Sequence, residues 1–355
     1  MKLKNIKKNI AFLFIYIIVS KSLYAEHNLD FPDLSDPRTI DGVEEFIDMY
    51  DVFAKEFTKY YSHAVLLSTQ LTLPVGESNL GSFPGLYLGF AGGAAFANSK
   101  KIRENTSEYI ADESTPKSLP SIGLSINAGL GITPDWDVWI SFFPAIRMNL
   151  GKVKGVQLNI GYGHVKIKTM YNIAEGSFLF PGAAIGGFVN YNRGSISAEV
   201  DEIKSTGYYY FSGSDQAVVQ DFTYKLSTSA NWEYYSFGPE IKGWYNMGII
   251  FPYAGYGVSM QMGKLKIIPV AEGKINVVIP ANPPLIPDNI IQESTGTFDL
   301  SKKASPSLIQ HRLIFGIEIR MFPKPITPTP KVTAEIQFDL TNRISGLSAG
   351  AGVQF

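Results

Sequence analysis

The chain alternates between apolar and polar residues with a period of two, and this pattern returns many times along its length. It is clearest over residues 121–132, where Ile, Leu or Ala stands at every even position and Ser, Gly or Asn at every odd one. A strand with one apolar face alternates in this way, whereas an amphipathic helix repeats every 3.6 residues. We therefore expect many antiparallel strands. Regular alternation also runs over 156–163, 218–227, 309–321, 332–341 and 347–355, and less regular candidates lie at 64–74, 85–97, 136–149, 182–191, 194–202, 207–213, 233–245, 247–261 and 264–279.

These strands have the length and composition of membrane-spanning strands. Many are longer than the five or six residues of an average soluble strand, and a tilted strand needs about 9–11 residues to cross a bilayer. Aromatic residues gather near strand ends at 136–143, 208–211 and 232–237, where a membrane interface favours them. A soluble β-sandwich also alternates but requires neither feature. We expect an all-β fold, a transmembrane antiparallel β-barrel of about 14 strands, with a range of about 12 to 16.

Residues 1–25 have the organisation of a cleavable signal peptide. A lysine-rich start precedes the apolar run 10–19, and Ala25 follows as the small residue at a cleavage point. The alternative is an uncleaved anchor, but an apolar run this short falls well below the roughly 20 residues that span a bilayer as a helix. The segment holds five lysines and no acidic residue, so cleavage leaves 26 basic against 32 acidic residues, a net charge of −6. We expect an exported protein of the outer membrane.

One segment after the signal peptide follows a helical pattern instead. Over residues 43–61, apolar side chains recur at intervals of three and four, which predicts an amphipathic helix within an N-terminal region of residues 26–62. The barrel would then occupy residues 63–355. The helix has three possible places: a plug in the barrel mouth, a cap at the periplasmic end, or the membrane interface. Its acidic polar face disfavours an anionic lipid surface.

The chain ends on a strand whose last residue is aromatic. Phe355 closes the sequence, and Val353 and Ala351 share its alternation. A terminal strand of this kind resembles the sorting signal of bacterial outer-membrane barrels. The resemblance implies recognition by a barrel-assembly machinery and insertion into outer-membrane lipid.

Composition and motifs exclude several kinds of chemistry. The chain has no cysteine, which removes disulfides and thiol nucleophiles, and its net charge of −1 gives no sign of nucleic-acid binding. His164 and His311 share parity with apolar neighbours, so we expect both to face lipid rather than a catalytic centre in the lumen, and His63 to follow the helix. Metal-binding histidine spacings and phosphate-binding loops are missing. We expect no enzyme, no cofactor and no metal.

Charged residues carry the functional prediction. Several stand at the polar positions of their strands, and charge is costly toward lipid but tolerated in a wet lumen. Both signs occur, which describes a hydrated pore; the alternative is that the charges pair with one another, or with the helix, inside a closed barrel. The candidate pore-lining residues are Arg312, Glu318, Arg320, Glu335, Asp339, Lys225, Asp221, Glu240 and Lys242.

Three functions are compatible with this layout. The first is a porin for small hydrophilic solutes, which the charged lumenal positions favour. The second is a ligand-specific transporter for hydrophobic compounds, since the layout resembles the fatty-acid transporter family in strand number and N-terminal segment, although that family's early Asn-Pro-Ala motif is missing. The third is an adhesin or binding barrel that displays long loops, expected at 98–120 and 280–306.

The lysine- and isoleucine-rich signal peptide, the mature size and the terminal Phe355 also resemble the outer-membrane porins of Borrelia-type spirochaetes, including their dicarboxylate-selective porin. This resemblance implies organic anions as solutes, with Arg312 and Arg320 as lumenal contacts. The oligomeric state is left open.

Overall fold

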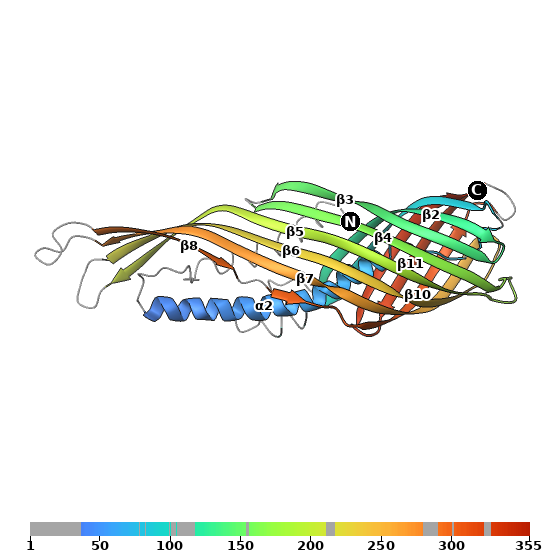
Figure 1. Ribbon diagram of the computed structural model, residues 1–355, viewed down its shortest axis with the longest axis horizontal. Helices are drawn as coiled ribbons and strands as arrows, with labels where there is room; N and C mark the ends of the chain where they lie inside the picture. The colour runs from blue at the N-terminus through green and yellow to red at the C-terminus, as the bar shows by residue number, and fades with distance from the viewer. Residues whose placement is uncertain are drawn as a thin grey trace, which may run out of the picture.

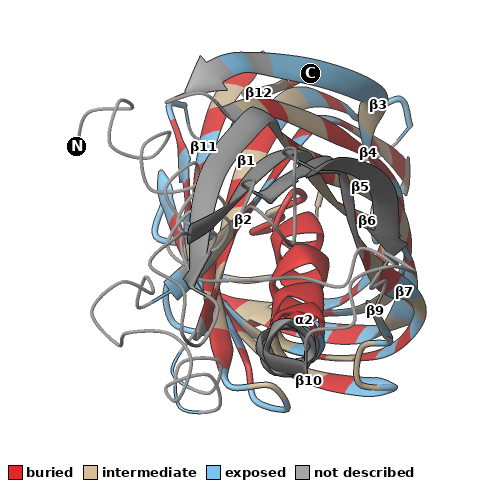
Figure 2. Ribbon diagram, turned by 90° about the vertical axis from the view of Figure 1, so that its left-hand side faces the viewer, coloured by how far each residue is buried: buried red, intermediate tan, exposed pale blue. Residues whose placement is uncertain are grey.

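In the computed structural model, strands close into a barrel with a helix inside it (Figures 1 and 2). The structure describes residues 37–355 apart from 78, 82, 99, 101–103, 105–117, 154–155, 211–216, 280–289, 300–301 and 323–327. The order of elements is one helix, seven strands, two short outer strands and three final strands. They are α2 (Pro37–Gln70), β1 (Leu86–Asn98), β2 (Ser118–Thr133), β3 (Trp136–Val153), β4 (Val156–Ala174), β5 (Gly182–Tyr210), β6 (Ala217–Trp244), β7 (Ile250–Ile279), β8 (Ile290–Asp299), β9 (Lys302–Ala304), β10 (Ile309–Arg320), β11 (Thr329–Asp339) and β12 (Ile344–Gln354).

Within the described part of the chain, ten strands form the closed ring. Neighbours pair antiparallel from β1 to β7 and from β10 to β12, while β12 pairs with β1 and β7 with β10. Each strand thus has a partner on both sides, and the ring leaves no open edge in the membrane, where an unpaired backbone group is costly. The short strands β8 and β9 pair with the outer part of β7 and lie outside the ring.

The expected 14 strands are too many because several predicted strands are parts of longer ones. The sequence pattern predicts three strands over residues 182–213, but a single strand, β5, covers 182–210. In the same way, β6 and β7 each replace two predicted strands. Polar residues near 192, 230 and 263 resemble turns in sequence, but β5, β6 and β7 continue through them. Beyond these residues the three strands leave the ring and form an extension. The remaining error is 64–74, which belongs to the helix and the chain that follows it.

The two ends of the barrel differ. At one end lie the start of β1, Phe355, the end of β10 and the connections 134–135, 175–181 and 245–249; we call it the C-terminal end. At the other, the loop end, β1 ends and β2 begins, and β5, β6 and β7 project beyond the ring together with β8 (Figure 1). β8 falls within the predicted loop 280–306, so part of that loop is a strand.

The helix is longer than predicted, and its C-terminal part lies inside the ring (Figure 1). It begins at Pro37 rather than 43 and ends at Gln70 rather than 61, and His63 is part of it. In Figure 1 its N-terminal end lies on the side of the extension, and the chain then runs into the barrel. Side chains of residues 54–70 are largely buried within the ring (Figure 2). A place in the barrel mouth was one of the three positions predicted for the helix. Among the described helices, none combines the length and apolar character needed to cross a membrane.

Alternation along the strands separates an outer face from a lumen. On β11, Lys331, Thr333, Glu335, Gln337 and Asp339 are buried, whereas the apolar residues between them are partly or fully exposed. The same division repeats around the ring. Large apolar side chains such as Phe90, Ile126, Val189, Phe315 and Leu347 form an outer apolar belt. This pattern confirms the alternation read from the sequence for most strands.

On β4 the predicted faces are inverted. Leu158, Tyr162 and His164 were expected to face lipid, but all three are buried in the lumen, and Val165 and Ile167 are on the outer face. The reason is the helix: apolar lumenal side chains at this level pack against apolar residues of α2. His311, in contrast, is on the outer face of β10, as predicted, and its imidazole contacts the Tyr256 hydroxyl.

Closure of the barrel between its first and last strands is directly testable. Leu88 and Val353 face each other across β1 and β12 on the outer face, and opposed Cα atoms in antiparallel strands are about 5 Å apart, within the range of a disulfide. The double variant Leu88→Cys/Val353→Cys should form an intramolecular disulfide on oxidation, seen as altered gel mobility without heating. In the pair Leu88→Cys/Ala349→Cys the partners are four residues out of register and should stay reduced. Equal cross-linking of the two pairs would contradict the register.

Candidate functional site

The candidate site is the lumen, where a segment of the chain is held by side chains of the wall. We call residues 54–80 the plug: the second half of α2 and the non-helical chain that follows it toward β1. Small wall residues let the plug backbone approach closely. A Cβ added at Gly93 would lie 2.6 Å from the Leu71 Cβ, and one at Gly123 would lie 2.7 Å from the Ser68 carbonyl oxygen. Gly93 and Gly123 therefore provide the space that the plug backbone occupies.

The loop end of the lumen is filled by apolar contacts. Phe57, Tyr61 and Val65 of α2 pack with Trp232 and Leu265 of the wall in one buried cluster. The Phe57 and Tyr61 rings stack with centroids 4.9 Å apart. Burial of such side chains stabilises by about 1.5–3 kcal/mol each. These apolar contacts hold the helix at the loop end but do not fix how far it extends along the barrel axis.

The centre of the lumen is polar, and its cations bind plug carbonyl groups. The Lys166 Nζ donates to the Gln70 carbonyl oxygen at 2.7 Å, and the Lys242 Nζ donates to the Val75 carbonyl oxygen at 2.7 Å. The first of these oxygens belongs to the last residue of α2, where the helix dipole places partial negative charge. A lysine of the wall thus satisfies a carbonyl that the helix itself leaves without a partner.

Wall side chains also bind the chain just beyond the helix. The Thr72 carbonyl oxygen accepts hydrogen bonds from Ser125 Oγ at 2.6 Å and from Asn127 Nδ2 at 3.1 Å. Near the C-terminal end, Asp137 accepts from the Leu80 amide at 3.2 Å, and Gln354 Nε2 donates to the Leu80 carbonyl oxygen at 3.2 Å. Backbone groups that leave the helix inside a barrel need such partners, because water is largely absent there.

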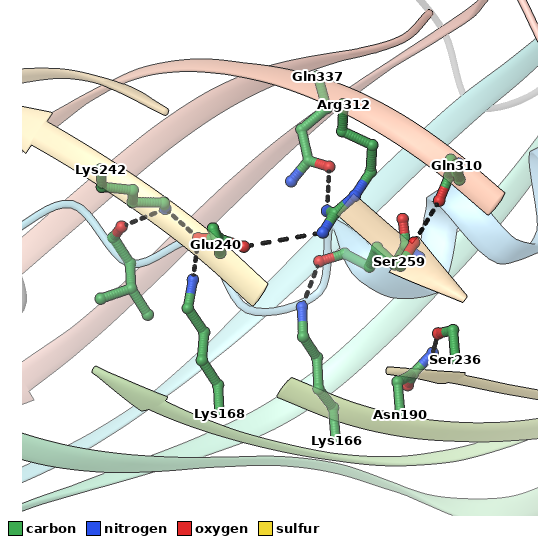
Figure 3. A network of polar contacts seen from close by, with 12 residues as sticks. Lys166, Lys168, Asn190, Ser236, Glu240, Lys242, Ser259, Gln310, Arg312 and Gln337 are labelled. Carbon is green, nitrogen blue, oxygen red and sulfur yellow. Dashed lines mark hydrogen bonds and ion pairs between the residues drawn. The ribbon is translucent and has the colours of Figure 1, made fainter. Parts of the chain in front are cut away.

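The charged residues of the wall form two groups. In the central group, the Glu240 carboxylate faces three cationic side chains (Figure 3). Its oxygen atoms lie 2.5 Å from the Lys168 Nζ, 3.4 Å from the Lys242 Nζ and 3.8 Å from the Arg312 Nη2. Glu335 accepts from Lys242 at 3.3 Å and from the Tyr253 hydroxyl at 2.9 Å.

The second group lies closer to the C-terminal end and includes a residue of the plug. Glu318 pairs with Arg320 at 2.9 Å and with Lys331 at 3.2 Å, and Arg320 also pairs with Glu77 of the plug. The Arg320 guanidinium stacks over the Phe251 ring, 4.1 Å from its centroid. Charge pairing therefore joins plug to wall as well as strand to strand.

The structure places seven of the nine predicted pore-lining residues in the lumen. All seven are buried there: Glu240, Lys242, Arg312, Glu318, Arg320, Glu335 and Asp339. Asp221 and Lys225 lie on the part of β6 that pairs with residues 272–276 of β7, in the extension rather than the ring, and their side chains lie outside the described residues. Among the assembly-signal candidates, Phe355 is exposed on the outer face and Val353 and Ala351 are half-buried; their role in assembly stays a prediction.

Sequence reasoning missed Lys166 and Lys168. Both are buried, facing the lumen from β4. They were missed because the apolar residues of 156–163 stand at even positions, which predicts that the even positions of this strand face lipid. The following residues carry the corrective signal: Val165 and Ile167 are apolar at odd positions, and Lys166 and Lys168 stand at the even positions beside them.

His164 faces the same lumen. Its Nε2 lies 2.9 Å from Ser141 Oγ and 3.1 Å from Thr72 Oγ1, and its Nδ1 lies 2.9 Å from the Tyr162 hydroxyl. The imidazole is thus a hydrogen-bonding contact of the plug. Across the described residues, His, Asp and Glu nowhere gather in a group of three or more that could hold a metal.

The barrel was compared with known proteins. Neither a family model nor a curated protein matches the sequence. Solved structures with a similar course include the translocator domain of the autotransporter NalP from Neisseria meningitidis (7% identity, 76% of this chain, 87% of that chain, TM-score 0.32), a Pseudomonas aeruginosa FadL homologue (8%, 84%, 98%, 0.25) and the P. putida toluene transporter TodX (9%, 77%, 89%, 0.22). These values are too low to add to the fold described above. The resemblance to Borrelia-type porins gains no support from these structures.

Loss of one wall cation should loosen the plug. In Lys166→Met the Gln70 carbonyl keeps its burial but loses its donor, which costs about 1–3 kcal/mol. Amide hydrogen exchange in the last turn of α2 should then be faster by roughly 5- to 150-fold, because local opening becomes easier by that amount. Lys264→Met, at an exposed position outside the lumen, is the matched control and should leave this exchange unchanged. Unchanged exchange in Lys166→Met would contradict the assigned contact.

Proposed function

We propose that the protein is an outer-membrane channel for small hydrophilic solutes, closed by its own N-terminal segment and opened when the plug moves. The observation that carries this proposal is the polar centre of the lumen. Its side chains hold the plug by hydrogen bonds and ion pairs rather than by a continuous apolar core. Once the plug leaves, those charged and polar groups would line a water-filled path through the ring.

The outer surface supports a membrane location. Large apolar side chains are exposed on strands all around the ring, including Phe90 at 67% and Val189 at 59% of their surface. A soluble monomer rarely exposes continuous apolar surface beyond a few hundred Å². A lipid bilayer would cover this belt.

The lengths of the connections support an orientation. Transmembrane barrels place short turns in the periplasm and long loops outside the cell. The longest connections, those between β1 and β2 and between β7 and β10, are at the loop end, although the β3–β4 and β11–β12 connections there are short. We propose that the C-terminal end faces the periplasm and the loop end faces outward. The helix N-terminus would then lie on the outer side, since α2 enters the ring from the loop end.

The extension favours a second candidate function. β5, β6 and β7 continue beyond the ring and pair there with β8. In the proposed orientation this sheet would stand outside the cell, where it could bind another molecule as an adhesin does. Transport of hydrophobic ligands is less well supported, because the centre of the lumen is charged.

Orientation can be tested with single cysteines, because the natural chain has none. Ser305→Cys is exposed at the loop end and Glu175→Cys is exposed at the C-terminal end. A membrane-impermeant maleimide should label Ser305→Cys on intact cells, and should label Glu175→Cys only after the outer membrane is permeabilised. Labelling of Glu175→Cys but not of Ser305→Cys on intact cells would invert the orientation. Absence of both variants from the outer-membrane fraction would contradict the membrane location.

Channel function can be tested by crowding the plug from the wall. In Gly123→Val, the added side chain meets Ser68, Thr72 and Tyr162, so the plug must shift. In planar bilayers this variant should give stepwise currents far more often than the natural protein. Gly92→Val is the control: it lies on the neighbouring strand, and its added Cβ meets only a Leu124 methyl at 3.3 Å and a backbone oxygen at 3.8 Å. Silence of a folded Gly123→Val barrel, with the plug shown to be displaced by faster exchange, would refute the channel.

A further inference from the structure

The centre of the lumen carries more cationic than anionic side chains. Four of its side chains are cations in water: Lys166, Lys168, Lys242 and Arg312. Three carboxylates are near them: Glu240, Glu335 and Asp339, which lies opposite Arg312 on β11. Glu240 and Glu335 accept hydrogen bonds from Lys168 and Lys242, and Asp339 accepts them from Gln310 and Asn342. Lys166 and Arg312 donate instead to neutral oxygen atoms, those of Gln70 and Gln337.

The plug supplies oxygen atoms where this charge needs them. Lys166 binds the carbonyl oxygen at the C-terminal end of α2, and Lys242 adds the Val75 carbonyl oxygen to its two carboxylate contacts. Both plug oxygens carry only partial negative charge, even with the helix dipole. The uncharged backbone of the plug thus supplies the oxygen atoms that these two lysine side chains bind.

Arg312 has donors that the plug does not use. Its Nη1 donates to Gln337 Oε1 at 2.9 Å, but Nε and Nη2 are buried and have no hydrogen-bond acceptor. The nearest carboxylate oxygen to Nη2, of Glu240, lies 3.8 Å away, beyond hydrogen-bond distance. An arginine that is 1% exposed with two spare donors is poised for an acceptor that this state of the protein does not provide.

Lys166 and Arg312 converge on one ring. The Lys166 Nζ lies 5.2 Å from the centroid of Phe188, and the Arg312 Cζ lies 5.0 Å from it. An aromatic ring stabilises a cation only modestly, and two cations on one ring repel each other. An anion that contacted both would relieve this repulsion and use the spare guanidinium donors, since arginine binds carboxylate and phosphate with paired N–H donors.

We propose that Lys166, Lys168, Lys242 and Arg312 form a binding site for the oxyanion group of a small solute, a carboxylate or a phosphate, which takes the place of the plug carbonyl groups when the plug moves. The proposal rests on the proposed channel function. It adds the class of solute, and it makes that solute a competitor of the plug: anion binding and plug closure exclude each other, so the anion favours the open form.

The site can be tested in the full-length Gly123→Val protein, in which the plug is displaced. In a KCl gradient its reversal potential should show preference for chloride, and succinate or phosphate should block the current. The double variant Lys166→Gln/Arg312→Gln in the same background should lose the preference for chloride. Its half-blocking concentration should rise by about tenfold or more, as expected when two charged hydrogen bonds are removed. Lys264→Gln/Arg193→Gln removes the same charge from exposed positions and should change neither quantity.

Binding measured without current separates this proposal from the channel. Calorimetric titration of detergent-solubilised Gly123→Val with succinate and with phosphate should give a saturable signal that Lys166→Gln/Arg312→Gln abolishes. Binding without conductance would refute the channel and keep the site. Chloride preference without succinate or phosphate binding would overturn the site, as would equal binding by the double variant. The relative strengths of the succinate and phosphate signals tell which oxyanion fits better.

Discussion

The structure depends on one constraint: a peptide that leaves a helix inside a barrel must find partners for its backbone groups. The amides of Leu71 and Thr72 still donate to carbonyl oxygens of α2, but the helix has ended there and β1 begins only at Leu86. The wall supplies partners instead, from Lys166 at the helix end to Ser125, Lys242 and Asp137 further along. Because a buried unpaired polar group costs about 1–3 kcal/mol, the wall determines where the plug lies. The polar lumen and the plug therefore account for each other.

The same constraint explains why the wall combines glycine with long charged side chains. Gly93 and Gly123 let the plug backbone approach β1 and β2, and Lys166 and Lys242 reach it from β4 and β6. Long cationic side chains suit both proposed states of the channel. In the closed state they bind peptide carbonyl groups, and in the open state they can bind water or an anion. A wall of apolar side chains would offer partners in neither state.

The sequence alone predicts the type of fold and most of the charged wall. Residues 309–320 and 329–339 alternate strictly, because lipid lies on one side of these strands and polar groups on the other, and so Arg312, Glu318 and Glu335 were placed correctly. Strand number could not be predicted, because β5, β6 and β7 continue beyond the ring and a polar stretch within one strand resembles a turn. The face of β4 was missed for a different reason: apolar residues turn toward the lumen wherever the plug is apolar, as at Tyr162 against the helix. Contacts between plug and wall join residues 53 to 274 positions apart, and no local pattern contains them.

A cross-link between helix and wall tests the central claim most directly. Ser68 of α2 and Ser121 of β2 have their Oγ atoms 3.0 Å apart inside the barrel. The variant Ser68→Cys/Ser121→Cys, oxidised in isolated outer membranes, should form a disulfide that joins the two peptides in a tryptic digest. The same variant, reduced, should protect both thiols from an impermeant maleimide. Two free thiols that react readily with the maleimide, and no joined peptide, would contradict a helix held inside the ring.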